Sequence, residues 1–275
     1  MSDELENDVI RVLSLGAGVQ STTVLRMMID GEIERADHAI FADTGWEPSA
    51  VYEHLLSLES AMAEAGIEFH RVTAGNIRDD ALAVGHRFAS MPLFFRDELG
   101  HTGMGRRQCT KEYKVEPITR KLRELSGLEP RQQSRAVLCV QVIGISWDES
   151  HRMRDARFPW IRNEYPLVDR RITRQGCLTW NDERGYSVPP RSACLGCPFH
   201  SDDEWRRIKD TEEWSDVVEF DAALRSSGVT ESRGFRGKAF LHKDRIAIDQ
   251  VDLRTNNERG VFSLFDQDCE GMCGL

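Results

Sequence analysis

The chain has 275 residues and a formal net charge of -10 at pH 7, which allow a sizeable core and argue against a protein devoted to coating nucleic acid. Its N-terminal segment is acidic where a secretion signal would be basic, and no apolar run approaches the roughly 18 residues of a membrane span, so we expect a cytoplasmic protein without a membrane partner. In a reducing compartment, the seven cysteines predict metal binding or thiol chemistry rather than a disulfide framework.

Short apolar runs alternate with longer amphipathic segments, a pattern typical of a parallel sheet covered by helices. The runs predict strands at residues 9–14, 38–42, 68–72 and 136–143. Apolar residues at helical spacing predict helices at residues 48–65, 115–125 and 202–225. We therefore predict an α/β fold with a mainly parallel sheet and flanking helices in residues 1–147. An irregular cap rich in arginine and cysteine, residues 148–275, is expected to pack on this core.

The first predicted strand runs into a loop of small residues that opens a helix. At such a turn, backbone N–H groups and the helix N-terminus converge on a phosphate or sulfate, and hydroxyls add donors. Packing between strand and helix is the alternative explanation for the glycines. The candidate anion-binding residues of this loop are Ser14, Gly16, Ala17, Gly18, Gln20, Ser21 and Thr22.

A second candidate segment, Asp43, Thr44, Gly45 and Trp46, follows the second predicted strand. Ligands of open α/β sheets bind outside the carboxyl ends of the strands, where this segment and the first loop both emerge. Asp43 is suited to accept from a ribose or an amine, and Trp46 to stack on a base. A simple turn or helix cap is the alternative for this segment.

Two basic segments supply candidate anion ligands. Residues 106–123 hold seven Lys or Arg against two Glu, and Cys109 lies among these cations, which favours its thiolate form. Residues 151–191, which follow the fourth strand and its loop, hold nine Arg and no Lys, and arginine binds phosphate or sulfate bidentately. A solvated helix face and structural ion pairs are the alternatives. The candidates in these segments are Arg106, Arg107, Lys111, Lys114, Arg152, Arg154, Arg157, Arg170 and Arg171. The loop at residues 144–150, which precedes the second segment, adds Gly144 and Glu149.

The sharpest local motif is Cys194-Leu195-Gly196-Cys197-Pro198, which can present two sulfurs to one metal centre. Cys269 and Cys273 lie close to the end of the chain. Spacing alone leaves zinc, an iron–sulfur cluster and a dithiol open. Cys139 lies in an apolar run and is predicted to be buried packing, whereas Cys177 has no partner in the sequence.

The order of these motifs resembles the phosphoadenosine phosphosulfate (PAPS) reductase family of the PP-loop adenine-nucleotide alpha-hydrolase superfamily. Residues 14–22 resemble the PP-loop, Asp43 to Gly45 the family's Asp-Thr-Gly, and residues 108–117 its Cys-Cys-x-x-basic-Lys-x-x-Pro segment. The resemblance implies a PP-loop/HUP-like nucleotide-binding fold, an adenine nucleotide at the loop and a [4Fe–4S] cluster. It further implies sulfonucleotide reduction by Cys273 with a thioredoxin-like reductant. The cluster ligands that it implies are Cys109, Cys194 and Cys197, with Cys269 as the candidate for a fourth bond.

Three departures from the family pattern keep other functions open. Gln108 stands where the family has the first of two adjacent cysteines, Met272 replaces the glutamate of the tail, and Gln20 stands where ATP-cleaving relatives carry aspartate. A cluster with three protein ligands is similar to that of base-thiolating PP-loop enzymes. The alternative is therefore ATP-dependent thiolation or a related modification of a nucleic-acid base, the only reading with a nucleic-acid partner. A second alternative is a nucleotide-binding regulatory protein with zinc on Cys194 and Cys197.

Overall fold

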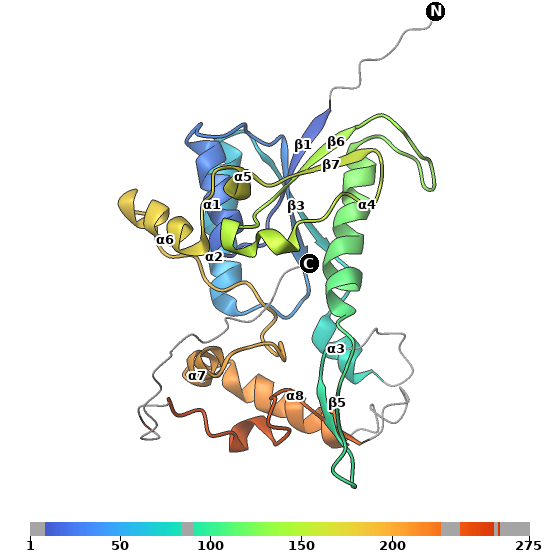
Figure 1. Ribbon diagram of the computed structural model, residues 1–275, viewed down its shortest axis with the longest axis vertical. Helices are drawn as coiled ribbons and strands as arrows, with labels where there is room; N and C mark the ends of the chain where they lie inside the picture. Colours follow the sequence, from blue (N-terminus) through green and yellow to red (C-terminus); the bar gives the residue numbers. More distant parts are fainter. Residues whose placement is uncertain (1–8, 84–90, 227–236, 256–257, 259–275) are drawn as a thin grey trace, which may run out of the picture. The chain divides into compact units, whose positions relative to one another are not determined.

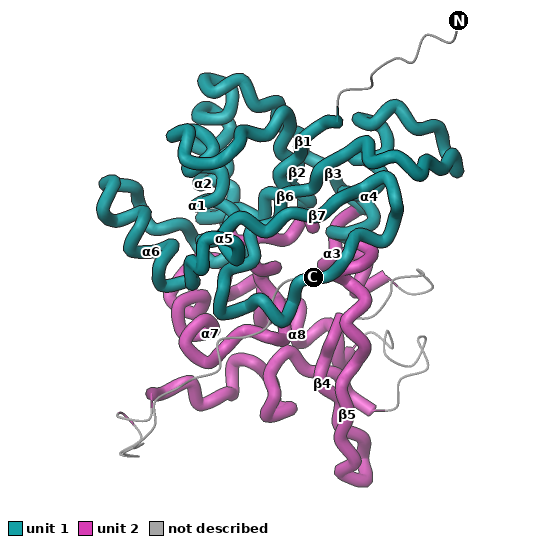
Figure 2. Tube along the Cα trace, turned by 45° about the horizontal axis from the view of Figure 1, so that its top comes forward, with its two compact units in different colours: residues 1–43, 49–74, 113–192 teal, residues 44–48, 75–112, 193–275 magenta. Residues whose placement is uncertain are grey.

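The computed structural model describes residues 9–83, 91–226, 237–255 and 258 (Figure 1). The chain forms two compact units, coloured separately in Figure 2. Unit 1 comprises Met1–Asp43, Ser49–Ala74 and Tyr113–Ser192, and unit 2 comprises Thr44–Pro48, Gly75–Glu112 and Ala193–Leu275. The units interleave along the chain, unlike the predicted division at a single boundary after residue 147.

Unit 1 is built on a five-stranded sheet in the order β3-β2-β1-β6-β7, in which every pair of neighbours is parallel. The predicted α/β class with a mainly parallel sheet and flanking helices is confirmed. The four predicted strands are found, and a fifth lies in the arginine-rich segment that we expected to be irregular. The strands are β1 (Ile10–Ser14), β2 (His38–Asp43), β3 (Glu68–Thr73), β6 (Cys139–Ile143) and β7 (Ile161–Glu164).

Alternation along the strands sends apolar side chains to both faces of this sheet. Leu13 and Phe41 join the larger buried cluster on one face, whereas Val12, Ile40 and Cys139 join a second cluster on the other. Because both faces of the sheet are covered at β1, β2 and β6, these inner strands are rich in apolar residues, which is why they were visible in the sequence.

Helices cover these two faces (Figure 1). The larger cluster includes residues of α1, α2, α5 and α6, and the second includes Leu122 of α4. In α2, the buried residues Val51, Leu55, Leu58 and Met62 repeat at helical spacing, as predicted. The helices are α1 (Val19–Ile29), α2 (Ser49–Glu64), α4 (Glu116–Leu125), α5 (Pro166–Asp169) and α6 (Arg174–Glu183), with the 3-10 helix η2 (Trp147–Arg152) after β6.

Unit 2 has a small antiparallel sheet in the order β5-β4-β8. The helix predicted at residues 202–225 is two helices, α7 and α8, because α7 ends at the C-cap Asp210. The elements are α3 (Ile77–Leu82), β4 (Phe94–Arg96), β5 (Thr102–Met104), α7 (Asp202–Lys209), α8 (Trp214–Ser226), β8 (Lys238–Phe240) and η3 (Ile248–Gln250). A π-helix, η1 (Thr110–Val115), precedes α4.

A buried carboxylate ties three parts of unit 2 together. Asp221 of α8 is fully buried; its Oδ1 accepts from Leu241 N at 3.0 Å and its Oδ2 from Ile248 N at 2.9 Å. Arg225, one turn further along α8, forms an ion pair with the same carboxylate. Because a buried charge is stable only when paired and hydrogen-bonded, Asp221 specifies how β8 and η3 join α8. In the described ranges, no helix has the length and apolar character needed to cross a membrane.

Candidate functional site

The loop between β1 and α1 follows the central strand of the unit 1 sheet. The first N–H groups of a helix have no partners within the helix. Gly18 is the N-cap of α1, and none of the described side chains caps this helix. Ala17 has a φ of 55°, in the left-handed region that residues with a Cβ rarely adopt. Gly16, beside it, is exposed. The loop therefore combines strained backbone with available donors, as anion sites do.

Serine hydroxyls shape this loop. Ser21 Oγ accepts a hydrogen bond from Gly16 N at 3.1 Å and donates to Gly18 O at 3.3 Å. Ser14 Oγ accepts from Nε2 of Gln141, on neighbouring β6, at 2.7 Å. The Ser21 hydroxyl is engaged within the loop, whereas that of Ser14 keeps a proton that it can donate.

Thr22 is fully buried, and its Oγ1 lies 3.1 Å from Nε2 of His54 on α2. Burial, followed by the charge of Arg26, lowers the pKa of His54 to about 4. The imidazole is therefore neutral at neutral pH and shares one hydrogen bond with the threonine. The structure gives this hydroxyl a role in packing α1 on α2, and its place in an anion cradle stays a prediction.

The loop after β6 packs tightly against the start of α1. A Cβ on Gly144 would lie 2.8 Å from both Cα and N of Ser21 and 3.1 Å from C of Gln20, so only glycine permits this approach. Ser146 is fully buried, and its hydroxyl has no hydrogen-bond partner among the described residues. The chain runs outward through β2 and β3 on one side of β1 and through β6 and β7 on the other, so these two loops meet at the topological switch point.

Side chains from both loops are joined at this position. Gln20 Nε2 donates to Glu149 Oε2 at 3.3 Å, and the same oxygen lies 2.7 Å from a terminal guanidinium nitrogen of Arg152. The sequence analysis named all three residues, but their mutual contact follows from the pairing of β1 with β6. Together they place a carboxylate and a guanidinium beside the β1–α1 loop.

Asp43, at the end of β2, is held by two neighbours in unit 1. Tyr52 donates to its Oδ1 at 2.9 Å, and Arg71 forms an ion pair with its Oδ2 at 2.6 Å. The guanidinium of Arg71 also lies 5.1 Å from the centre of the Tyr52 ring. Sequence reasoning missed both neighbours. The contact of Arg71 with Asp43 depends on the parallel register of β2 and β3, whereas Tyr52 lies on α2. The predicted contact of Asp43 with a ribose or amine stays a prediction.

The next residues, Thr44 to Trp46, belong to unit 2. Trp46 is only 5% exposed; its Nε1 donates to Asp216 at 2.7 Å, and its ring centre lies 4.5 Å from that of Phe220. Gly45 has a φ of 74° and contacts Asn76 closely. This conformation agrees with the alternative that the segment forms a simple turn. The structure therefore corrects the expectation that Trp46 offers a face for base stacking, because its indole is packed inside unit 2.

The Cys194–Cys197 motif forms a tight turn in unit 2. Cys197 N donates to Cys194 O at 3.0 Å, and the ring of His200 lies 3.0 Å from the same oxygen. A Cβ on Gly196 would lie 2.1 Å from the Trp46 ring, so the glycine is required by this packing. The hydrogen bond within the turn, the contact with His200 and the packing of Gly196 on Trp46 together hold the conformation of this turn.

The thiol of Cys194 contacts polar side chains that follow β2 in the sequence. Its Sγ donates to Thr44 Oγ1 at 3.3 Å and lies 3.8 Å from Glu47 Oε1. Thr44 in turn donates to Glu47 Oε1 at 3.0 Å, and both residues are buried. Glu47 was absent from the sequence candidates, although it lies within four residues of Asp43. Cys109 belongs to the same unit, and Cys109, Cys194 and Cys197 are all partly exposed.

The other cysteines differ in their surroundings. Cys139 and Cys177 are fully buried in unit 1, and burial raises their pKa values to about 12 and about 11. Cys139 is therefore buried packing, as predicted, and Cys177 has the same character. Cys269 and Cys273 lie outside the described residues, so their roles stay predictions.

The predicted anion-binding cations differ in exposure. Arg106 and Lys111 are exposed, whereas Arg107 and Lys114 are partly buried. Arg107 Nε donates to Thr110 Oγ1 at 3.1 Å. The anion-binding roles of these four residues stay predictions.

The arginines of residues 151–191 make local structural contacts. Arg154 donates to two backbone oxygens of its own segment at 2.9 and 2.7 Å, and Arg170 donates to the backbone oxygen of Glu32. Arg157 and Arg171 lie 5.5 and 5.8 Å from the centres of aromatic rings. These contacts agree with the structural alternative, and the ligand roles stay predictions.

No protein-family model and no curated protein matches the chain. Among solved structures, the chain is similar to the U34-tRNA thiolase NcsA from Methanococcus maripaludis with its [4Fe-4S] cluster. The likeness has 12% sequence identity and a TM-score of 0.41, and it covers 98% of this chain and 80% of that chain. At this level of similarity, function has to be argued from the chain's own residues.

Proposed function

We propose that the chain is an adenine-nucleotide-dependent enzyme of the PP-loop type that carries an iron–sulfur cluster and modifies a nucleic-acid base. The observation that carries the nucleotide-binding part of the proposal is the close approach of the β1–α1 loop and the loop after β6 at the switch point of a parallel sheet. Ligands of open α/β sheets bind at such a point because loops of opposite direction leave a crevice there.

The chemistry of the β1–α1 loop supports phosphate binding. The first turn of α1 contains no acidic residue, and none of the described side chains caps it, so a bound anion meets backbone N–H groups and the positive end of the helix. Arg152, held by Glu149 at 2.7 Å, adds a cation within the same unit. We assign the nucleotide phosphates to this loop. The adenine specificity rests on the resemblance in sequence.

Three cysteines of unit 2 are the candidate ligands of an iron–sulfur cluster. Cys109, Cys194 and Cys197 are partly exposed, unlike the fully buried Cys139 and Cys177, so a metal can reach their sulfur atoms. The rigid turn from Cys194 to Cys197 restricts the positions of two of these sulfurs. Cys109, Cys194 and Cys197 would hold the cluster, which would supply the chemistry for carrying sulfur to the base.

The proposed reaction conserves atoms and charge without a separate oxidant. The carbonyl oxygen of the base attacks the α-phosphorus of ATP, and the bond to pyrophosphate breaks as the new P–O bond forms. A sulfur donor at the oxidation level of sulfide then adds to the base carbon that carries this oxygen. The C–O bond breaks, and AMP leaves with the oxygen. Backbone N–H groups and Arg152 would stabilise the charge that develops on the phosphates.

The first experiment counts iron, zinc and acid-labile sulfide in anaerobically purified protein. We expect about four irons and four sulfides per chain, lost in Cys109→Ala and Cys194→Ala and retained in Cys177→Ala, a matched substitution in unit 1. Zinc alone at the two cysteines would instead support a regulatory nucleotide-binding protein and would exclude the proposed sulfur transfer.

The second experiment identifies the reaction. Cluster-loaded protein is incubated with ATP, sulfide and either bulk tRNA or DNA, and the nucleosides are analysed by mass spectrometry. We expect pyrophosphate release stimulated by one nucleic acid, together with a thiolated nucleoside. Nucleotide binding without pyrophosphate release from any of these mixtures would overturn the proposal.

Sulfonucleotide reduction is a second candidate because Cys273-Gly274-Leu275 resembles the segment that carries the nucleophile in PAPS reductases. In that reaction, the Cys273 thiolate attacks the sulfur of a sulfonucleotide, the nucleotide phosphate leaves, and a thioredoxin-like dithiol reduces the enzyme S-sulfonate to release sulfite. Cys273→Ser separates the two functions. It should abolish sulfite release if reduction is the activity and leave base modification intact if modification is the activity.

A further inference from the structure

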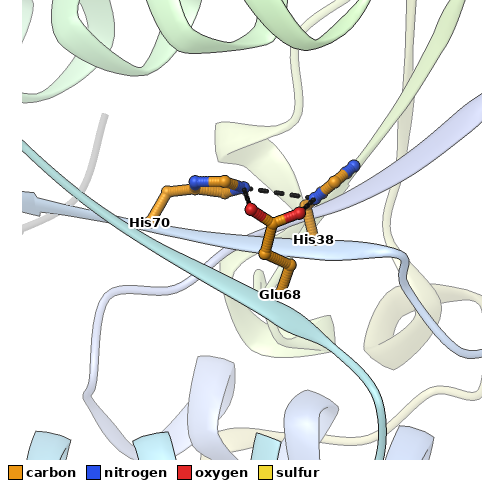
Figure 3. Close-up of side chains that lie close together, drawn as sticks. All are labelled: His38, Glu68 and His70. Atoms are coloured by element: carbon orange, nitrogen blue, oxygen red, sulfur yellow. Dashed lines mark hydrogen bonds and ion pairs between the residues drawn. The ribbon is translucent and has the colours of Figure 1, made fainter. Parts of the chain in front are cut away.

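Three potential metal ligands meet at the amino ends of β2 and β3 in unit 1. Figure 3 shows His38, Glu68 and His70 pointing toward one another. His38 and Glu68 are the first residues of their strands and are paired in the parallel register, and His70 pairs with Ile40. Because side chains alternate along a strand, all three lie on the face that carries Ile40. The cluster is therefore a consequence of strand pairing between segments 30 residues apart.

The separations within the cluster match those of a coordination sphere. His38 Nδ1 lies 3.1 Å from His70 Nε2 and 3.3 Å from Glu68 Oε2, and His70 Nε2 lies 3.7 Å from Glu68 Oε1. Ligands at about 2.0–2.1 Å from a tetrahedral zinc ion lie about 3.3–3.4 Å apart. Small rotations of the side chains would bring all three ligands onto one ion.

The surroundings favour binding of an ion from solvent. The histidine side chains are 18% and 12% exposed, so they are largely held in place, whereas the Glu68 side chain is 66% exposed. The carboxylate side gives an ion access and leaves room for water as a further ligand. On α4, Lys121 interacts electrostatically with His70 and opposes a cation, but it is itself paired with Glu124 at 2.7 Å.

We propose that His38, Glu68 and His70 form a binding site for a divalent transition-metal ion, with Zn²⁺ the best fit to two imidazoles and one carboxylate. The site lies apart from the nucleotide loop, because His38 and Asp43 are at opposite ends of β2, about 17 Å apart along an extended strand. Its ligands are also different from the cysteines of unit 2. The site therefore stands independently of the proposed enzyme activity.

Such an ion would join the edge strand β3 to the neighbouring strand β2. β3 is the edge strand next to β2, and the ion would link the two strands through side chains in addition to their backbone hydrogen bonds. Because an ion that binds only the folded protein stabilises it by mass action, thermal stability should depend on the metal concentration.

The test uses the full chain without a polyhistidine tag, titrated with Co²⁺ in place of spectroscopically silent Zn²⁺. The variants are His38→Ala, His70→Ala and Glu68→Gln, and His101→Ala is the matched control because His101 is an exposed histidine paired with Asp97. Circular dichroism of each metal-free variant checks that it is folded. We expect the wild type and the control to bind one more equivalent of Co²⁺ than the two histidine variants, and Glu68→Gln to bind that ion at least tenfold more weakly.

The absorption spectrum of the additional ion distinguishes the two kinds of metal ligand. The difference between wild type and His70→Ala should lack thiolate-to-cobalt charge transfer, because no cysteine belongs to the proposed set. Zn²⁺ should raise the melting temperature of the wild type and the control more than that of the His38 and His70 variants. Equal Co²⁺ stoichiometry in all folded variants, or thiolate character in the difference spectrum, would overturn the proposal whatever the enzyme activity proves to be.

Discussion

Gly144→Ala is the most direct perturbation of the switch point. The added Cβ would lie 2.8 Å from two backbone atoms of Ser21 and 3.1 Å from the carbonyl carbon of Gln20. Carbon atoms in optimal contact are about 3.5–4.0 Å apart, so the overlap is about 1 Å. The atoms that must move belong to the first turn of α1, since backbone cannot rotate away as a flexible side chain can.

The expected cost follows from that overlap. Insertion of a methyl group into a packed site typically destabilises a protein by about 1–3 kcal/mol, and backbone on the opposing side favours the upper half of this range. A domain of ordinary stability, about 5–15 kcal/mol, stays folded with this loss. Since the displaced turn contains Gln20 and Ser21, we also expect at least tenfold weaker binding of ATP.

Urea unfolding, followed by circular dichroism, gives the change in the free energy of unfolding, and calorimetry gives the ATP affinity. Gly16→Ala is the control for the unfolding measurement alone, because its Cβ would meet only side-chain oxygens, the nearest at 3.5 Å, and because Gly16 belongs to the proposed phosphate-binding loop. Its unfolding free energy should change by no more than about 1 kcal/mol, with any gain arising from the less flexible unfolded chain. The reasoning is refuted if Gly144→Ala unfolds at the same urea concentration as wild type and binds ATP equally well.

Three further predictions concern other parts of the molecule. Gly196→Ala should destabilise unit 2 by at least about 2 kcal/mol, because the Cβ would overlap the buried Trp46 ring at 2.1 and 2.3 Å. Urea unfolding followed by tryptophan fluorescence checks this, and a midpoint equal to that of wild type would contradict it. Cys139 and Cys177, whose pKa values burial raises to about 12 and about 11, should resist iodoacetamide at pH 8 until the protein unfolds, and mass mapping of labelled native protein checks this. Burial lowers the pKa of His54 to about 4, so the unfolded chain takes up the proton first as the pH falls. The free energy of unfolding should therefore decrease between about pH 6.5 and pH 4, by about 1 kcal/mol at pH 5 after allowing for partial exposure. In urea unfolding, His54→Gln should lose less stability than wild type between pH 7 and pH 5, and equal losses would contradict this origin.

The success of sequence reasoning in unit 1 has a physical cause. Strands buried on both faces need continuous apolar runs, and helices that cover them need apolar residues at helical spacing. Those patterns are local, so β1, β2 and β6 and the helices at α2 and α4 could be predicted. The edge strand β3 was also predicted, although none of its residues is fully buried. β7 was missed because only Ile161 of its four residues is buried, which leaves no apolar run to detect.

Unit 2 offered weaker signals. Its three strands have three residues each, too few to display an alternation, and β4 pairs with β8 more than 140 residues further along the chain. The break between α7 and α8 falls in residues 209–213, none of which is apolar, and the prediction of one helix bridged this gap from the apolar residues on either side.

The candidate site divides in the same way. The sequence by itself determined the β1–α1 loop and the Cys194–Cys197 turn, because each depends on neighbouring residues whose backbone preferences are local. Only the tertiary structure decided that Trp46 is buried, that Glu149 holds Gln20, and that two histidines and a glutamate converge on β2 and β3. These contacts depend on strand register and packing between distant segments, and a shift of one residue in register would turn the same side chains to the opposite face.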